Sequence, residues 1–174
     1  MKKKIIAVLG ILALCLAGLL TFKTVQKYKK KQAVAIRKQT LPAFQFYNQD
    51  LQKFNASQLK VGIPVCIFYY NAECDHCQYE ATEIKKHIEA FKNIQVIMVS
   101  TNAPTETIQF VNQYQLKGYE FITWLYDKDY SFYKWFGQSV TPSVYIYNKQ
   151  HKLVKEYTGE VKIAAVLQNL KYDE

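Results

Sequence analysis

Two cysteines separated by two residues are the side chains best suited to chemistry. Cys74 and Cys77 enclose Asp75 and His76, follow an apolar run and open a predicted helix. The free N–H groups and the dipole at the start of a helix stabilise a thiolate, which is the nucleophilic form of cysteine. We therefore expect thiol–disulfide exchange in which Cys74 attacks the disulfide of a partner. Cys77, one helical turn further and more buried, would then release the partner by forming an internal disulfide.

Other uses of a cysteine pair fit the sequence less well. A structural zinc ion needs four ligands, commonly two such pairs, and Cys66 with His87 is a poor second pair. Covalent haem attachment requires a histidine directly after the second cysteine, where this chain has Gln78. We therefore expect no metal and no cofactor, and an inert structural pair stays open as an alternative.

Thr141-Pro142 is a second motif, placed directly before a predicted strand at 143–147. A cis bond before proline costs little and suits a tight turn. Beside an exchange site, such a turn would expose backbone groups that can pair with a substrate strand. The alternative is an ordinary proline that opens a strand. The cysteine motif elsewhere in the chain favours the cis turn.

Segments with strand or helix patterns alternate from residue 42 onward, and these elements must position the motifs. Periodicity predicts strands at 44–47, 51–55, 61–70, 94–99, 121–126, 143–147 and 152–157. It predicts helices at 75–91, 105–116, 127–137 and 161–170. This order predicts an α/β fold whose mixed central sheet is flanked by helices. In such a sheet the site lies at the carboxyl ends of the parallel strands.

The residues from Val65 to Cys77, VCIFYYNAECDHC, resemble the strand and active-site loop of the thioredoxin superfamily. Within it, the chain is most similar to the membrane-anchored TlpA/ResA-like thiol-disulfide oxidoreductases. Glu80 matches the glutamate of their C-x-x-C-x-x-E pattern, and Thr141-Pro142 matches their cis-proline loop. Tyr157-Thr158-Gly159 matches the strand end before their last helix. The similarity covers residues 41–172.

This resemblance implies a three-layer thioredoxin-like fold with an N-terminal hairpin and a central helical insertion near residues 104–116. It implies catalytic roles for Cys74 and Cys77, and for Glu80 as a partly buried acid that moves protons during exchange. For Glu80 the alternative is a surface position on the helix. It also implies protein thiols or disulfides as substrates, and an upstream thiol–disulfide donor or acceptor as partner.

The chain departs from the family pattern at three places. Glu73 replaces the tryptophan that usually precedes the first cysteine, which makes the partner surface more acidic. Phe68 stands where classical thioredoxins carry a buried aspartate, so the later glutamate is the only nearby candidate for that role. A cationic His76 would stabilise the Cys74 thiolate and make the disulfide more oxidising, while Asp75 would oppose it. Which of these two opposite effects on the disulfide is larger stays open.

The positive charge belongs to the N-terminus. Of the formal net charge of +9, residues 1–40 carry ten Lys and Arg and no acid, whereas residues 41–174 carry thirteen Lys and Arg against fourteen Asp and Glu. A nucleic-acid-binding domain would need a basic face of its own. We therefore expect no nucleic-acid partner.

An uncharged, mostly apolar run of eighteen residues, Ile5 to Phe22, lies between lysines. As a helix it would extend roughly 27 Å, close to a hydrocarbon core of about 30 Å. This predicts a transmembrane anchor over residues 1–22, with a cleavable signal peptide as the alternative, a basic juxtamembrane stalk over 23–40 and the thioredoxin-like domain over 41–174. Basic residues on both sides leave the orientation open. The resemblance implies an extracytoplasmic domain on the periplasmic side of a bacterial membrane.

Five other residues have simpler interpretations. Cys66 is expected to be a small buried hydrophobe, and Cys15 lies in the apolar run. His87 and His151 are expected to be solvated. Trp135 is our choice for an aromatic residue at the rim of the site.

The predicted function is thiol–disulfide exchange on extracytoplasmic proteins, in the reducing direction. A peroxiredoxin-type peroxidase is one alternative, but that class needs a threonine three residues before its reactive cysteine, where this chain has Asn71. A non-enzymatic module that docks a partner through the groove at Pro142 is the other alternative.

Overall fold

Seven strands form one mixed sheet within residues 2–171, the part of the chain whose backbone the computed structural model describes; side chains are described for residues 14–170. The strand order is β2-β1-β5-β4-β3-β6-β7. β3, β4 and β5 are parallel, and the other pairings are antiparallel. The strands are β1 (Gln45–Tyr47), β2 (Lys53–Asn55), β3 (Val65–Tyr70), β4 (Gln95–Ser100), β5 (Ile122–Tyr126), β6 (Ser143–Tyr147) and β7 (Leu153–Thr158).

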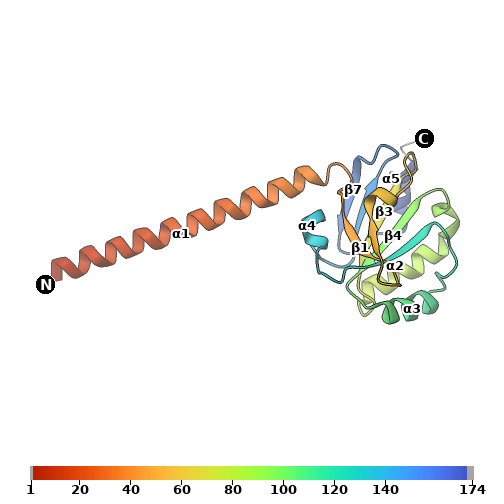
Figure 1. Cartoon of the computed structure of the whole chain (residues 1–174), viewed down its shortest axis with the longest axis horizontal. Helices are drawn as coiled ribbons and strands as arrows, with labels where there is room; N and C mark the ends of the chain where they lie inside the picture. Colours follow the sequence, from red (N-terminus) through yellow and green to blue (C-terminus); the bar gives the residue numbers. More distant parts are fainter. Residues whose placement is uncertain (1, 172–174) are drawn as a thin grey trace.

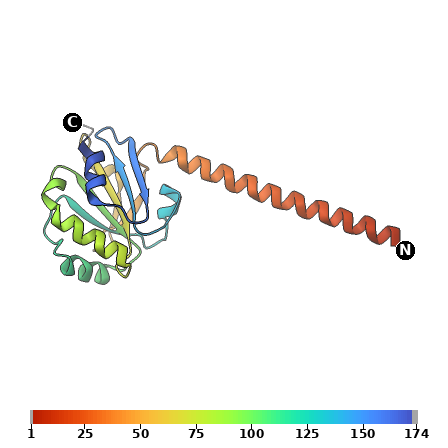
Figure 2. The same ribbon diagram turned by 180° about the vertical axis from the view of Figure 1, so that it is seen from behind.

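Helices cover both faces of this sheet. The α-helices are α1 (Lys2–Arg37), α2 (Asp75–Lys86), α3 (Pro104–Gln113), α4 (Phe132–Phe136) and α5 (Ile163–Lys171), with 3₁₀ turns η1 (Ala56–Gln58) and η2 (Ile88–Phe91). Residues of α2, α3 and α5 pack in one core cluster, and residues of α4 pack in the other. Figure 2 shows α2 and α5 in front of the sheet. The β1–β2 hairpin and the α3–β5 insertion confirm the predicted three-layer fold.

β3 forms the centre of both core clusters because all six of its side chains are buried. Cys66, Phe68 and Tyr70 face the cluster with α2 and α5. Val65, Ile67 and Tyr69 face the cluster with α4. A strand buried on both faces needs a continuous apolar run, which is the pattern that the sequence shows. The CxxC motif therefore follows a strand that is buried along its whole length.

Two predicted boundaries were wrong at the ends of elements near the site. The strand predicted at 61–70 begins only at Val65, because Gly62 has a φ of +80° in a turn and Pro64 has no N–H to donate. The helix predicted at 75–91 ends at Lys86 and continues as the turn η2. His87 between them has non-helical angles of −107° and 20°.

The helix predicted at 127–137 is shorter, and Asp127 is the reason. This carboxylate is buried and accepts the N–H groups of Ser131 and Phe132 at 2.7 and 2.9 Å. It therefore closes a turn before α4, which delays the start of the helix to Phe132. Gly137, in the left-handed region at a φ of +88°, ends the helix as predicted.

α1 is a continuous helix that extends away from the sheet (Figure 1). Among the described residues, no helix is both long and apolar enough to cross a membrane. Residue 1 and the side chains of residues 2–13, about half of the predicted anchor, lie outside the described part of the chain. The anchor over residues 1–22 therefore stays a prediction.

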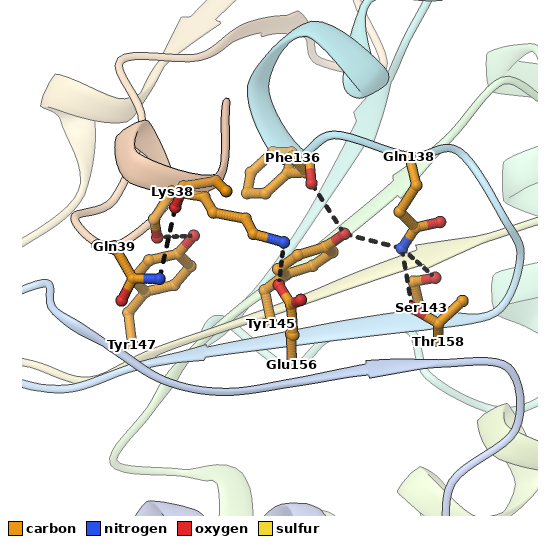
Figure 3. Close-up of polar contacts among 10 residues, drawn as sticks. Lys38, Gln39, Phe136, Gln138, Ser143, Tyr145, Tyr147, Glu156 and Thr158 are labelled. Carbon is orange, nitrogen blue, oxygen red and sulfur yellow. Dashed lines mark hydrogen bonds and ion pairs between the residues drawn. The ribbon is translucent and has the colours of Figure 1, made fainter. Parts of the chain in front are cut away.

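The end of α1 packs on the domain. Val34 is buried, and its Cγ1 lies 3.2 Å from the position that a Cβ on Gly137 would occupy. Arg37 donates to the carbonyl oxygen of Lys134 at 3.1 Å. After the helix, Lys38 pairs with Glu156 on β7 at 2.5 Å (Figure 3). The contacts of the domain thus begin inside the segment predicted as a stalk over 23–40.

Candidate active site

Cys74 occupies the N-cap position of α2, with extended angles of −85° and 118°. The loop before it is closed by Asn71. The carbonyl oxygen of Asn71 accepts the N–H of Cys74 at 3.2 Å, and its side-chain oxygen accepts the N–H of Glu73 at 2.8 Å. Such turns are typical of asparagine. The half-buried Cys74 sulfur is thereby held at the positive end of the helix, where a thiolate is favoured.

A second asparagine, from the neighbouring strand end, fixes the same loop. Asn102 accepts the N–H of Ala72 at 2.8 Å through its side-chain oxygen, which also accepts the hydroxyl of Ser100 at 2.7 Å. Gln78 donates to the carbonyl oxygen of Ala72 at 2.9 Å. Sequence reasoning missed Asn102, although its place after a predicted strand parallel to β3 was a usable signal.

Cys77 lies one turn further along α2 and is 2% exposed. The N–H of Asn71 points at its sulfur across 3.5 Å. Burial raises the pKa of the Cys77 thiol well above its usual range, the N–H of Asn71 opposes this, and Cys74 and Glu80 add to the rise. Cys74 and Cys77 are both free thiols in this structure. The two thiols therefore differ in access, with only the first one open to a partner.

Glu80 lies in the interior of the domain, since it is 3% exposed. Burial raises the pKa of this carboxyl to about 8; an N–H from the Val161 backbone lowers it, and the charge of Glu160 raises it. Its Oε1 atom has no hydrogen-bond partner among the described residues. The same carboxyl contributes to raising the pKa of Cys77 and of the buried Cys66. Glu80 is thus a buried acid close to the second thiol.

The Thr141–Pro142 peptide bond is cis and lies directly beside Cys74. The carbonyl oxygen of Thr141 is 4.0 Å from the Cys74 sulfur. On the other side of the loop, Gly159 donates its N–H to the carbonyl oxygen of Pro142 at 2.9 Å. The structure therefore brings together the two motifs that the sequence analysis singled out.

Gln138 organises the approach to this loop, as Figure 3 shows. Its Nε2 donates to the hydroxyls of Tyr145 at 2.8 Å and Ser143 at 2.9 Å, and its Oε1 accepts the N–H of Val140 at 2.7 Å. Sequence reasoning missed Gln138, because a lone glutamine in a predicted loop carries no signal. Its role depends on β6 passing beside the loop.

His76 and Glu73 lie on the solvent side of the site. The Nδ1 atom of His76 is 2.5 Å from a carboxylate oxygen of Glu160, in the loop between β7 and α5. Glu73 and Asp75 are exposed. Glu73 lines a small groove of about 180 Å³ together with Asn102 and residues of α3. Exposed carboxylates thus surround the accessible thiol.

A family model described as the AhpC/TSA family matches residues 38–156, more than half of the chain. The chain belongs to the AhpC/TSA family. No curated protein sequence matches it.

Solved structures with this fold come from several redox proteins. DsbF of Mycobacterium tuberculosis has a TM-score of 0.66 and 20% identity over 76% of this chain and 96% of that chain. A putative thioredoxin from Neisseria meningitidis has a TM-score of 0.64 and 25% identity over 78% of this chain and 90% of that chain. The peroxidoxin BcpB of M. tuberculosis has a TM-score of 0.64 and 16% identity over 78% of this chain and 96% of that chain. These similarities confirm the thioredoxin-like fold predicted for this AhpC/TSA-family chain.

Two residues of this AhpC/TSA-family protein were placed wrongly from the sequence. Trp135 packs on the cluster of the other sheet face and not on the one that contains Cys74 and Cys77. His151 is half-buried and not solvated, because it closes the turn between β6 and β7 with a φ of +55°. Its Nε2 is buried without a hydrogen-bond partner among the described residues.

The other single-residue predictions of this kind were correct where the structure describes them. Cys66 is fully buried, and His87 is exposed. Among the described residues, no group of three or more His, Cys, Asp or Glu side chains could hold a metal ion.

Proposed function

We propose that this protein is a thiol–disulfide oxidoreductase in which Cys74 is the nucleophile and Cys77 the resolving thiol. One observation carries the proposal. Cys74 is half-buried at the start of α2, and Cys77 is buried one turn later with the N–H of Asn71 directed at its sulfur. This asymmetry separates the thiol that meets a client from the thiol that completes the reaction.

The reaction runs in two exchanges when the client is reduced. The Cys74 thiolate attacks one sulfur of the client disulfide, a mixed disulfide forms, and the other client sulfur leaves as a thiolate and takes up a proton. Cys77 then loses its proton and attacks the Cys74 sulfur, so that the internal disulfide forms and the second client thiolate leaves and is protonated. Two electrons and two protons pass from the protein to the client.

Glu80 would handle the proton of the resolving thiol. A carboxyl whose pKa is about 8 is present in both forms near that pH, and its ionised form can accept the proton of Cys77 through the Oε1 atom. In the reverse direction the same carboxyl returns the proton when the internal disulfide is reduced. Because Glu80 is buried, this proton does not need to cross bulk water.

The carbonyl oxygen of Thr141 provides a docking point for the client backbone. It lies 4.0 Å from the Cys74 sulfur, so an extended client segment that pairs with it would present its own cysteine to Cys74. Asp75, His76 and Glu73 line the solvent side of this approach. We expect protein clients in preference to small disulfides for this reason.

We further propose an extracytoplasmic protein held by its N-terminal helix and working in the reducing direction. The uncharged run from Ile5 to Phe22 supports the anchor. A secreted disulfide oxidoreductase of M. tuberculosis, 17% identical over 75% of this chain, shares the fold. An upstream thiol–disulfide donor would return electrons to the Cys74–Cys77 pair after each turnover.

The test is reduction of insulin disulfides by the full chain with dithiothreitol as the reductant. Cys74→Ser should reduce turnover to the background rate, and Cys77→Ser should accumulate a mixed disulfide that non-reducing electrophoresis detects. Cys15→Ser, which changes a thiol on α1, is the matched control and should retain full activity. Normal turnover in Cys74→Ser would overturn the proposal.

A peroxidase is the second candidate, because a peroxidoxin shares the fold at a TM-score of 0.64. Asn71, at the position where that class needs a threonine, uses its side-chain oxygen on the N–H of Glu73 and its carbonyl on Cys74. That arrangement builds the loop and leaves the side chain turned to backbone groups. Thiol-dependent consumption of hydrogen peroxide that is lost in Cys74→Ser would favour the peroxidase.

A further inference from the structure

The loop between β7 and α5 contacts three separate parts of the candidate site. Gly159 donates to the carbonyl oxygen of Pro142 at 2.9 Å. Glu160 places a carboxylate oxygen 2.5 Å from the Nδ1 atom of His76. The backbone of Val161 lies near the buried carboxyl of Glu80 and lowers its pKa, against the larger effect of burial. Three successive residues therefore join the proline loop, the residues between the cysteines and the buried acid.

Glu160 belongs to none of the motifs in the sequence, and its ion pair is exposed. The side chains of His76 and Glu160 are 68% and 42% exposed. Exposed ion pairs contribute little to folding stability. The fold therefore gains little from this contact of 2.5 Å, and its importance is that it holds a residue between the two reactive cysteines.

Ionisable side chains lie around Cys74 on the active-site loop, on α2 and on the loop between β7 and α5. Glu73 and Asp75 flank it in the chain, and His76 follows. Glu160 faces His76 from the β7–α5 loop, and Glu80 lies buried beneath. The loop at 138–142 carries no ionisable side chain. His76 is therefore the only residue of this set that can carry a positive charge, and Glu160 contacts it directly.

We propose that Glu160 is a positioning residue that neutralises His76 and so keeps the Cys74–Cys77 pair a reducing couple. An unpaired imidazolium next to Cys74 would stabilise the thiolate, and stabilising the reduced form makes a dithiol pair more oxidising. With Glu160 in place, the imidazolium adds no net charge. This inference rests on the proposed function, since it assigns the direction of electron flow to that site.

The Asp75-His76 pair alone left this direction undecided. The ion pair with Glu160 removes the positive contribution of His76, and the negative charges of Asp75 and Glu73 remain. Carboxylates near a thiol disfavour its ionised form. The neighbouring side chains thus bring no net positive charge to Cys74, which corresponds to the reducing end of the scale of disulfide oxidoreductases.

The test compares Glu160→Gln with the unaltered site in the full chain carrying Cys15→Ser, so that Cys74 is the accessible thiol. At pH 6.0, where an unpaired histidine is mostly protonated, Glu160→Gln should increase the alkylation rate of Cys74 by iodoacetamide about threefold. At the same pH, equilibration with glutathione should show the variant to be more oxidising. Glu89→Gln, an exposed acid on η2, is the matched control and should change neither quantity.

A second variant tests whether Glu160 acts on Cys74 through His76 or directly through its own charge. In a His76→Asn background, Glu160→Gln should have no effect on the alkylation rate, because the cation that Glu160 neutralises is gone. An unchanged or slower rate in Glu160→Gln, or an equal increase in both backgrounds, would overturn the inference. Failure of the proposed function looks different, since the chain would then reduce no insulin while the alkylation rate still responds to Glu160→Gln.

Discussion

Gln138 and Tyr145 are joined by a 2.8 Å hydrogen bond from the side-chain amide to the phenol oxygen. Through this bond the loop that contains Pro142 is fixed to β6, the strand between β3 and β7. The same amide group also holds Ser143. The geometry of the client-docking loop therefore depends on one side chain outside every recognisable motif.

Replacing Gln138 by Ala should loosen this loop. The free energy of unfolding should fall by about 1–3 kcal/mol, because partners in a largely buried network lose their hydrogen bonds. Insulin reduction should slow by more than alkylation of Cys74, since docking is affected and the thiol is not. Gln150→Ala in the turn before β7, where the side chain is exposed, is the control. Equal loss of both rates would contradict this account.

Glu80 should make stability depend on pH in a specific direction. Its pKa is raised from 4.5 to about 8 in the folded protein, so the folded state holds a proton that the unfolded state releases above pH 4.5. The contribution of protonated Glu80 to the free energy of unfolding is therefore fully present below about pH 4.5, and it is lost as the pH rises through 8. Between pH 5 and 8.5 the wild type should lose roughly 3 kcal/mol more than Glu80→Gln.

Urea unfolding of the reduced proteins at both pH values measures this difference. Glu89→Gln is the control and should follow the wild type, because Glu89 is exposed. Parallel pH profiles for wild type and Glu80→Gln would show that the buried carboxyl is already ionised in the folded protein.

The sequence was sufficient for the parts of the site that depend on local pattern. The apolar run before Cys74 predicted a strand buried on both faces, and the apolar periodicity after it predicted a helix. Pro142 could be assigned because proline marks its own turn. Gln138 and Glu160 could not be found this way, because each meets its partner only when β6 and β7 lie beside the loop and α2. Packing between distant segments, and not local propensity, creates those contacts.

The same distinction explains the errors in the elements. A helix does form within the predicted range 127–137, but it begins only at Phe132. The buried Asp127 carboxylate competes with the helix for backbone N–H groups. Nothing in the local pattern shows that Asp127 is buried. Its burial follows from its place at the carboxyl end of β5.

Asp127→Ala should be among the most destabilising changes in the chain. The variant loses acceptors for the N–H groups of Ser131 and Phe132, and bonds to a charged acceptor are each worth about 1.5–3 kcal/mol. We expect a loss of roughly 3 kcal/mol in urea unfolding. Asp129→Ala, at an exposed position two residues later, should cost less than about 0.5 kcal/mol. Similar losses in the two variants would argue against the capping role.

Gly137→Ala should lower the free energy of unfolding in two ways. Alanine at a φ of +88° is strained by about 1 kcal/mol. Its Cβ would also meet the Cγ1 atom of Val34 at 3.2 Å, closer than ordinary packing allows. Adding Val34→Ala should remove the second penalty only, so the double variant should be more stable than the two single losses predict. Additive losses, measured by thermal unfolding, would show that the contact is not strained.

Val34 packs against Gly137 and Arg37 bonds to the carbonyl oxygen of Lys134, so the last turns of α1 are part of the folded domain. A fragment that begins at Leu41 would lack Val34, Arg37 and Lys38, and would leave Gly137 and Glu156 without their packing partners. A fragment that keeps every described contact of the domain therefore includes the last turns of α1.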